Sequence, residues 1–194
     1  MGETDKAHAR RVREGWYDKY VKEPIIDIGA GIDPIPVGIP RKWDNFWTGD
    51  TDATFMEGVP DESYQTVYTS HILEHLSDPE TGIRNWFRIL KPGGYLIIVV
   101  PHRDLYEKKK ELPSRWNPRH REGDEGHAFF YMPYGDEPPD TKGLTATINR
   151  ALKDLPFDMY RDVFVRDEGY DHSLPPEAHP VGEYSIEQIV RKLE

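Results

Sequence analysis

Histidines stand in this 194-residue chain at the places where proton-transfer chemistry is expected. His71 follows the β-branched and aromatic run at 66–69, and His102 follows the apolar run at 95–100. Both runs are typical of strands, and open α/β sheets hold their ligands at the carboxyl ends of strands. An imidazole with its ordinary pKa of about 6.5 takes up or releases a proton near neutral pH. The predicted catalytic residues are therefore His71, His102 and His127, with His120 as a further candidate.

Some of these histidines also have the spacing of metal ligands. His71 and His75 lie four residues apart, which places them on one face if their segment is helical. A second candidate set for a divalent metal consists of His120, Asp124 and His127. We expect no bound metal at either set. Glu74 and His75 are better explained as residues that stabilise the turn after the strand.

A glycine-containing turn is the second place where chemistry is expected. The run Ile25-Ile26-Asp27-Ile28 is short and apolar, and it leads into Gly29-Ala30-Gly31. This pattern predicts a buried strand of a parallel sheet followed by a tight turn. Glycine has no Cβ, so the backbone can take a positive φ and a ligand can lie directly on it. We therefore expect a ligand at this turn.

Composition excludes several classes of function. The chain has 25 basic and 35 acidic residues, and its formal net charge of -10 disfavours a nucleic-acid partner. It has no cysteine, which excludes disulfides, thiol nucleophiles and cysteine-ligated zinc. The longest apolar run, 95–100, is too short to span a membrane, and residues 1–13 lack the apolar core of a signal peptide. We expect a cytoplasmic protein without a membrane span.

The elements that would position these groups can be read in order along the chain. A helix is expected over 6–20, because Val12, Trp16 and Tyr20 are spaced by four; it would pack on the sheet or, alternatively, cover the pocket. The prolines of 34–40 predict a loop where a crossover helix is usual. A short strand is expected over 42–47.

The best-defined element is a helix that begins after Asp78, with Pro79 in its first position. Its apolar residues at 83, 86, 87 and 90 follow a helical period, and the sequence at 91–94 ends it. Beyond it we expect a strand at 95–100, a long loop or lid insertion at about 102–142 and a helix at 145–155. Antiparallel strands are expected at 157–165 and 186–190, joined by a loop at 167–183, although Ile186, Ile189 and Val190 also fit a helix. These elements form one domain, 1–194.

Taken together, four segments resemble those of a known family. They are Ile25-Ile26-Asp27-Ile28-Gly29-Ala30-Gly31, Asp52-Ala53 with Val59-Pro60-Asp61-Glu62-Ser63-Tyr64, Ser70-His71-Ile72-Leu73-Glu74-His75-Leu76, and Arg88-Ile89-Leu90-Lys91-Pro92-Gly93-Gly94-Tyr95. In this order the chain resembles the class I S-adenosylmethionine-dependent methyltransferases, of the branch often called type 11. The resemblance implies an α/β fold: a Rossmann-like, doubly wound, mainly parallel sheet with an antiparallel last strand, in a three-layer sandwich.

The resemblance also implies cofactor contacts. Gly29, Ala30 and Gly31 would pass beneath the methionine part of S-adenosylmethionine, and Asp27 would orient its amino group. Asp52 would face the adenine amine beside the Ala53 amide. Asp44, or in its place Asp50, would bind the ribose, and Ser70 and His71 would line the methyl-transfer pocket. The alternatives are that Asp27 only caps the turn and that Asp52 is an ordinary turn residue. Asp33 departs from the family pattern, because a third glycine is common there.

The reaction implied is methyl transfer, in which the protein aligns donor and acceptor in a dry pocket. The expected acceptor is a small molecule or glycan, and the resemblance favours a sugar hydroxyl because this branch often serves glycan and natural-product pathways. A histidine would take the hydroxyl proton. One alternative is a cofactor-binding scaffold without catalysis. The other is an enzyme that modifies protein or nucleic acid, which would dock through the basic cluster of Lys108, Lys109, Lys110, Arg115, Arg119 and Arg121.

Overall fold

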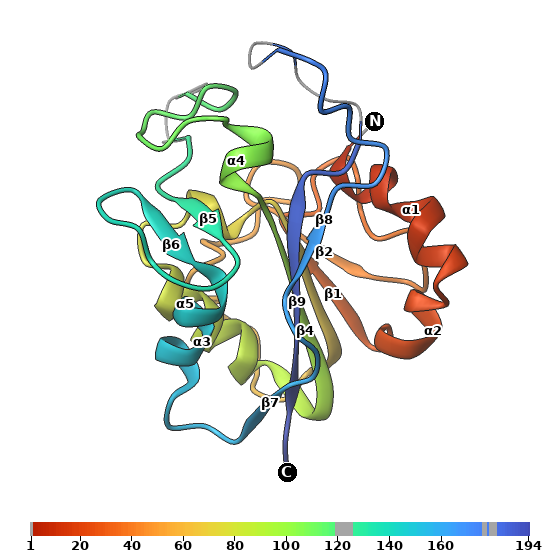
Figure 1. Ribbon diagram of the computed structural model, residues 1–194. Helices are drawn as coiled ribbons and strands as arrows, with labels where there is room; N and C mark the ends of the chain where they lie inside the picture. Colours follow the sequence, from red (N-terminus) through yellow and green to blue (C-terminus); the bar gives the residue numbers. More distant parts are fainter. Residues whose placement is uncertain (1, 119–125, 176–177, 179–181) are drawn as a thin grey trace.

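A seven-stranded sheet runs through the middle of the protein in the computed structural model, which describes residues 2–118, 126–175, 178 and 182–194 (Figure 1). The strands are β1 (Ile25–Ile28), β2 (Arg41–Trp43), β3 (Tyr64–Ser70), β4 (Leu90–Pro101), β7 (Phe157–Met159), β8 (Phe164–Arg166) and β9 (Ser185–Lys192). Their order is β2-β1-β3-β4-β9-β7, with β8 also paired to β9.

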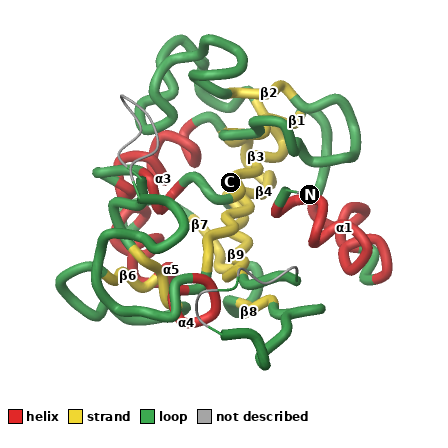
Figure 2. The backbone as a smooth tube through the Cα atoms, turned by 90° about the horizontal axis from the view of Figure 1, so that it is seen from above, coloured by secondary structure: helices red, strands yellow, loops and turns green. Residues whose placement is uncertain are grey.

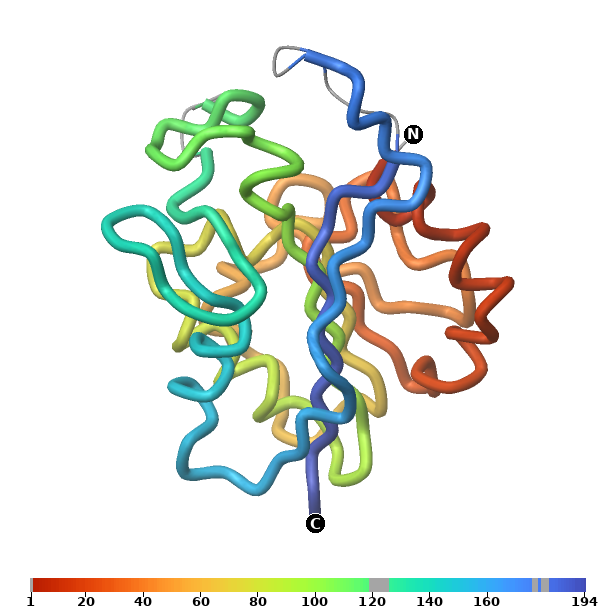
Figure 3. The backbone as a smooth tube through the Cα atoms, in the orientation of Figure 1, coloured from red at the N-terminus to blue at the C-terminus, as the bar shows by residue number. Residues whose placement is uncertain are grey.

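Strands β2, β1, β3 and β4 are parallel, whereas β9 runs antiparallel to β4. Figure 3 follows the chain as its last strand returns to the middle of the sheet beside β4. The predicted α/β class, with a mainly parallel sheet and an antiparallel last strand, is confirmed. The buried and mostly apolar residues of β1 and β4 are typical of parallel strands that are covered on both faces.

Helices cover both faces of the sheet. The helices α3 (Pro79–Arg88) and α5 (Leu144–Leu152) lie on one face, and α1 (Glu3–Arg13) and α2 (Trp16–Tyr20) lie on the other (Figures 1 and 2). Each face has its own apolar core. Trp86 and Ile148 belong to the core on the α3 face, and Trp16 and Tyr20 belong to the core on the α2 face. The predicted three-layer arrangement is therefore present.

The prediction of one helix over 6–20 is wrong, because the chain breaks at Gly15. This residue has a φ of +62°, a left-handed conformation that separates α1 from α2. Trp16 and Tyr20 are buried as expected, but the Val12 side chain is 57% exposed. The break changes the helical phase, so the residues on either side of it no longer share one face.

Buried charges attach α1 to the sheet instead of an apolar stripe. The Arg11 guanidinium is fully buried, and it donates to the Tyr68 hydroxyl at 2.8 Å and to Glu187 Oε2 at 3.3 Å. Arg10 Nε donates to Glu183 Oε1 at 2.8 Å. Arg11 also lies over the Trp16 ring, 4.4 Å from its centroid. These contacts connect α1 with β3, β9 and α2.

The helix α3 begins as predicted. The Asp78 side chain accepts from the Thr81 N–H at 3.1 Å, and Pro79 takes the first helical position. The apolar side chains of the helix are buried. The segment 30–40 contains no helix, as the prolines predicted, and its Ile35 is buried among the residues of the α2 face.

Two predicted strands are shorter than expected. The strand at 42–47 ends at Trp43, because Asp44 Oδ1 accepts from the Phe46 and Trp47 N–H groups, both at 2.9 Å, and turns the chain. The strand at 157–165 is divided into β7 and β8. Between β7 and β8 the Gln188 side chain of β9 donates to the Arg161 carbonyl at 2.7 Å. This side-chain bond stands where a backbone hydrogen bond between paired strands would otherwise lie.

The segment 102–142 contains several short elements in its described part. They are the helix α4 (Arg103–Tyr106), the strand β5 (Phe130–Met132) and the beginning of β6 (Thr141–Gly143), which pairs with β5. Phe130 and Tyr131 are buried. Among the described residues, no helix is both long and apolar enough to cross a membrane.

Asp33 provides the N-terminal cap of α1. Gly2 precedes this helix and has no side chain that could accept a hydrogen bond. Asp33 Oδ2 instead accepts from the Thr4 N–H at 2.7 Å and the Asp5 N–H at 3.2 Å. An acid from a distant loop therefore satisfies two N–H groups that every helix leaves open at its start.

We expect Asp33→Ala to lower the free energy of unfolding by about 1 kcal/mol, because the two N–H groups lose their acceptor. Urea unfolding measures this loss. The exposed Asp158→Ala on β7 removes the same charge without removing a cap, and we expect it to change the free energy by less than about 0.5 kcal/mol. Equal effects of the two substitutions would show that the cap contributes nothing.

Candidate functional site

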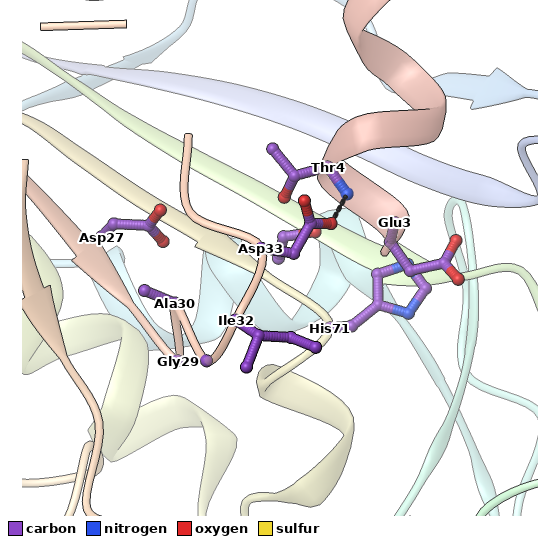
Figure 4. Close-up of a pocket in the computed structure, with 10 residues that line it drawn as sticks. Glu3, Thr4, Asp27, Gly29, Ala30, Ile32, Asp33 and His71 are labelled. Carbon is purple, nitrogen blue, oxygen red and sulfur yellow. Dashed lines mark hydrogen bonds between the residues drawn. The ribbon is translucent and has the colours of Figure 1, made fainter. Parts of the chain in front are cut away.

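A cleft of about 220 Å³ opens where β1 and β3 end, below the start of α1 (Figure 4). Three parts of the chain meet there. The residues that line it are Glu3, Thr4, Asp27, Gly29, Ala30, Gly31, Ile32, Asp33, Ser70 and His71. The structure thus brings together six of the predicted cofactor-binding residues, and the first turn of α1 covers them.

The turn after β1 has the conformation that its glycines predicted. Gly29 has a φ of +74° and Gly31 a φ of +48°. The Gly29 N–H donates to the Trp43 carbonyl at 2.8 Å, which connects the turn with the end of β2. A Cβ at position 29 would lie 1.9 Å from Ile72 Cγ1, so only glycine fits between this turn and the segment after β3.

Asp27 combines the two roles that its sequence position suggested. Its Oδ2 accepts from the Ile35 N–H at 2.6 Å, which fixes the loop after the turn. The same carboxyl also lines the cleft. Burial raises the pKa of Asp27 to about 7, against the hydrogen bond from Ile35, and the negative charge of Asp33 adds to the rise.

Asp33, at the position of the absent third glycine, lies between the turn and α1. Figure 4 shows its hydrogen bond to Thr4 at the edge of the cleft. Because this acid caps α1, it holds Glu3 and Thr4 in the cleft lining. The sequence analysis did not place Glu3 or Thr4 at the site. They are 29 or more residues from Asp33, so no local pattern signals this contact.

The two candidate ribose acids lie in one loop after β2. Asp44 Oδ2 accepts from the Gly31 N–H at 3.3 Å, so this carboxylate lies directly beside the glycine turn. Asp50 Oδ1 instead accepts from Arg41 at 3.4 Å and Asp50 Oδ2 from the Asp44 N–H at 3.2 Å. The geometry favours Asp44 for a ligand that rests on the turn.

Asp52 and Ala53 lie outside the described lining of the cleft. Asp52 Oδ1 accepts from the Thr54 N–H at 2.7 Å, which is the ordinary turn role that the sequence left open. The Ala53 carbonyl accepts from Trp86 Nε1 at 2.9 Å, which fixes this loop on α3. Their contact with adenine stays a prediction.

The three predicted catalytic histidines occupy different environments. His71 lines the cleft, and its Nε2 lies 3.2 Å from Ser185 Oγ. Burial lowers the pKa of His71 to about 4, although the nearby Glu3 opposes this. His102 caps α4, with its Nδ1 accepting from the Asp104 N–H at 3.1 Å. Burial lowers the pKa of His102 as well. The structure does not bring His102 into the cleft.

His127 is 5% exposed and lies behind the cleft. Its ring stacks on Tyr106, its Nδ1 is 3.3 Å from Glu107 Oε1, and its Nε2 is 4.0 Å from Glu74 Oε1. It is too enclosed to meet an acceptor in the cleft. The further candidates His120 and Asp124 lie outside the described residues.

Glu74 is the residue whose importance the sequence analysis missed. It sits in the short 3-10 helix η1 (Leu73–His75), is fully buried, and faces a histidine on each side along the chain. Burial raises the pKa of Glu74 to about 7, with His127 opposing the rise. The signal was in the sequence Ser70-His71-Ile72-Leu73-Glu74-His75, which places an acid between two histidines.

The contact between the glycine turn and Ile72 gives a prediction for a pair of substitutions. We expect Gly29→Ala to destabilise the protein by about 3 kcal/mol, from the clash with Ile72 and the positive φ. In the double variant with Ile72→Ala the contacts with Cγ1 and Cδ1 disappear, and the backbone strain and a 3.3 Å approach to the Cβ of residue 72 stay. If the two single losses were additive, they would predict a certain free energy of unfolding for the double variant. We expect denaturant unfolding to give a value at least about 1 kcal/mol higher than that prediction. Additive effects would contradict the contact.

Comparison with known proteins agrees with this geometry. The family model described as a methyltransferase domain matches residues 16–133, which is more than half of the chain. A curated protein of Mycolicibacterium smegmatis, named as a probable S-adenosylmethionine-dependent methyltransferase, is 28% identical over 136 residues. The match covers 58% of this chain and 52% of that protein, so the chain spans about half the length of the curated relative.

Solved structures share the fold. One is a Thermotoga maritima S-adenosylmethionine-dependent methyltransferase, described as a possible histamine N-methyltransferase, with a TM-score of 0.54, 17% identity and full coverage of both chains. Another comes from work on the conversion of a disulfide bond into a thioacetal group during echinomycin biosynthesis; its TM-score is 0.60 at 13% identity, over 96% of this chain and 80% of that one. The chain therefore belongs to the class I S-adenosylmethionine-dependent methyltransferases, with S-adenosylmethionine as its cofactor.

Proposed function

We propose that this methyltransferase acts in the cytoplasm on a hydroxyl group of a small molecule or glycan, with a sugar hydroxyl as the preferred acceptor. The observation that carries the proposal is the position of His71. It is the one predicted catalytic histidine in the described lining of the cleft, and it stands there beside Ser70 and opposite the glycine turn. Because burial lowers the pKa of His71 to about 4, its ring is uncharged at neutral pH and has a nitrogen lone pair for the proton that the acceptor must lose.

The cleft residues fit the cofactor. The turn at Gly29 and Gly31 offers a backbone surface without side chains, and the buried Asp27 carboxyl faces the space above it. Asp27 would bind the amino group of the methionine part, and Asp44, tied to the Gly31 N–H, would bind the ribose. When bound, S-adenosylmethionine supplies an electrophilic methyl group on a sulfonium.

The residues of the chain would then align the acceptor and take its proton. The acceptor oxygen would take the methyl group that bound S-adenosylmethionine supplies, and the hydroxyl proton would pass to a ring nitrogen of His71. The Ser185 hydroxyl, 3.2 Å from His71 Nε2, orients the ring.

A docking surface for a large acceptor has less support. In the basic cluster, Lys108 Nζ donates to the Leu174 carbonyl at 3.2 Å and Lys109 Nζ to the Pro113 carbonyl at 2.6 Å, so both lysines serve the fold. Arg119 and Arg121 lie outside the described residues. The net charge of -10 also opposes a nucleic-acid acceptor.

Turnover of nucleotide sugars and simple glycans tests the acceptor, with methylated product measured by mass spectrometry. For the acceptor that reacts, we expect His71→Asn to lower kcat by about 100-fold or more, with the Kd for S-adenosylmethionine within about fivefold of wild type. The exposed His172→Asn is the control and should leave both values unchanged. Unchanged kcat in His71→Asn refutes the role of His71. Cofactor binding without turnover of any acceptor favours the scaffold.

Asp27 gives a prediction for stability against pH. Its pKa is about 7 in the folded protein and about 3.9 in an unfolded chain. Between pH 4 and pH 7, therefore, Asp27 is protonated in the folded protein and ionised in the unfolded chain. Stability must therefore fall as pH rises from about 4 to 7 and stay low above 7. We expect Asp27→Asn to be roughly 2–4 kcal/mol more stable than wild type at pH 8 and nearly equal to it at pH 4. Urea unfolding at the two pH values measures both differences.

The same carboxyl should make cofactor binding depend on pH. An ionised Asp27 attracts the amino group of S-adenosylmethionine, so affinity should rise about tenfold from pH 6 to pH 8 as Asp27 loses its proton. Calorimetric titration of wild type and Asp27→Asn separates this effect from the titration of the cofactor itself. The variant should bind more weakly at pH 8 and lose the tenfold rise. An equal rise in both proteins would refute the contact.

A further inference from the structure

A buried carboxylate without hydrogen-bond partners lies behind the cleft. Within the described part of the chain, neither side-chain oxygen of Glu74 has a hydrogen-bond partner, and the residue is fully buried. Its Oε1 lies 3.9 Å from His75 Nε2 and 4.0 Å from His127 Nε2. An acid in such a place costs free energy unless a cation or a proton compensates it.

Both histidines turn the same ring nitrogen, Nε2, toward Glu74. His75 Nδ1 lies 2.9 Å from the Gly126 carbonyl, which leaves Nε2 as the nitrogen that faces Glu74. His127 Nδ1 lies 3.3 Å from Glu107 Oε1, and its Nε2 faces Glu74. The outer nitrogen of His75 therefore meets a carbonyl oxygen, and that of His127 lies beside a carboxylate without a hydrogen bond. In both rings the inner nitrogen, Nε2, is turned toward Glu74.

Backbone contacts keep the three groups together although 52 residues separate His75 from His127. The Glu74 carbonyl accepts from the Ala128 N–H at 2.7 Å and the Phe129 N–H at 3.2 Å. These bonds place the segment that carries His127 directly on η1. The rings of His75 and His127 meet edge to face, with centroids 4.9 Å apart. The arrangement is therefore built by the fold and does not depend on long, exposed side chains.

We propose that Glu74, His75 and His127 bind one divalent transition-metal ion of the zinc type. One ligand atom from each residue lies within 4.8 Å of the others. A tetrahedral zinc ion with ligands at about 2.0–2.1 Å needs donor atoms about 3.3 Å apart, so small side-chain rotations complete the site. His127 Nε2 would release the 3.1 Å hydrogen bond from Asn117, whose amide keeps its bond to the Tyr106 hydroxyl at 2.7 Å.

The donor set indicates the class of ion. Two imidazoles and one carboxylate suit zinc and its neighbours in the first transition row, whereas magnesium and calcium prefer oxygen ligands alone. Three protein ligands leave a fourth position open for water. Of the three side chains, that of His75 is the most exposed, at 31%.

The site is close to the cofactor cleft but is argued independently of the acceptor. His71, which lines the cleft, has its Nδ1 3.8 Å from Glu74 Oε1. A metal on Glu74 would thus be separated from the cleft by the His71 side chain. The inference concerns binding of the ion and holds whichever acceptor the enzyme methylates.

Metal binding by the full chain, freed of metal by a chelator and dialysed, tests the proposal. Zn²⁺ titration against a competing chromophoric chelator should show one bound equivalent, with an affinity at least 100-fold above that for Mg²⁺. Co²⁺ in place of Zn²⁺ should give visible absorption bands of a low-coordinate ion. Absence of one saturable Zn²⁺ equivalent, or preference for Mg²⁺, would refute the site.

Variants locate the ion. We expect Glu74→Gln and His75→Asn each to weaken Zn²⁺ binding by at least about 100-fold and to remove the Co²⁺ bands, and Glu107→Gln to weaken it about 10-fold to 100-fold through His127. The exposed His172→Asn should bind as wild type does. Circular dichroism and thermal unfolding establish that each variant is folded. Should Glu74→Gln not fold, the partly exposed His75→Asn decides alone.

Wild-type affinity in both His75→Asn and Glu74→Gln would overturn the proposal. Such a result would assign the cluster to proton sharing between Glu74 and its histidines. Equal loss in His172→Asn would likewise overturn it, because the ion would then bind nonspecifically to histidines. None of these readouts uses methyl transfer, so failure here is separate from failure of the proposed acceptor.

Discussion

The close approach of Gly29 to Ile72 is the constraint on which the rest of the site depends. A Cβ at position 29 would lie 1.9 Å from Ile72 Cγ1. The backbone of the turn after β1 therefore packs directly against the Ile72 side chain in the segment after β3. This contact sets where the cofactor surface lies relative to His71 and Glu74, which flank Ile72 in the sequence. Interiors are packed too densely for such elements to shift independently. The cleft and the Glu74 cluster are therefore positioned by the same contact.

Electrostatics positions α1, which covers the cleft. Its attachment to the sheet uses the buried guanidinium of Arg11 with Glu187, and its N-terminus is capped by Asp33. Breaking a buried ion pair leaves an unpaired charge and costs roughly 3–5 kcal/mol, whereas an apolar contact of similar area tolerates more adjustment. A helix attached in this way keeps Glu3 and Thr4 at fixed places in the cleft lining.

Whether a feature could be predicted from the sequence depends on how many residues separate the groups that interact. Asp78 and Thr81 are three residues apart, so the start of α3 could be read from the chain alone. The mainly parallel sheet with its antiparallel last strand and the glycine turn followed from apolar runs and from the family resemblance. The Asp33 cap could not be predicted, because it joins residues 29 apart. Val12 was wrongly placed on the same apolar face as Trp16 and Tyr20, because a spacing of four residues gives one face only in an unbroken helix. The helix breaks at Gly15.

The Glu74 cluster shows the same limit at the site itself. Local spacing suggested His71 with His75, or His127 with its own neighbours, as separate sets. The structure joins members of the two sets through Glu74, whose backbone carbonyl binds the segment before β5.

The acids of the cleft also explain how a loop can replace the usual crossover helix. A helix N-terminus favours anions, whereas the donor of a methyltransferase carries a cationic sulfonium and an amino group. The cleft of this protein contains the carboxyls of Glu3, Asp27 and Asp33. Each is fixed by a further bond: Glu3 to Lys6 at 2.9 Å, Asp27 to the Ile35 N–H, and Asp33 to the Thr4 N–H. Because these groups are held before any ligand arrives, the cleft needs little reorganisation to receive a cation. In this protein the segment 30–40 is a loop, and the cleft is bordered by carboxyls where a helix N-terminus would otherwise lie.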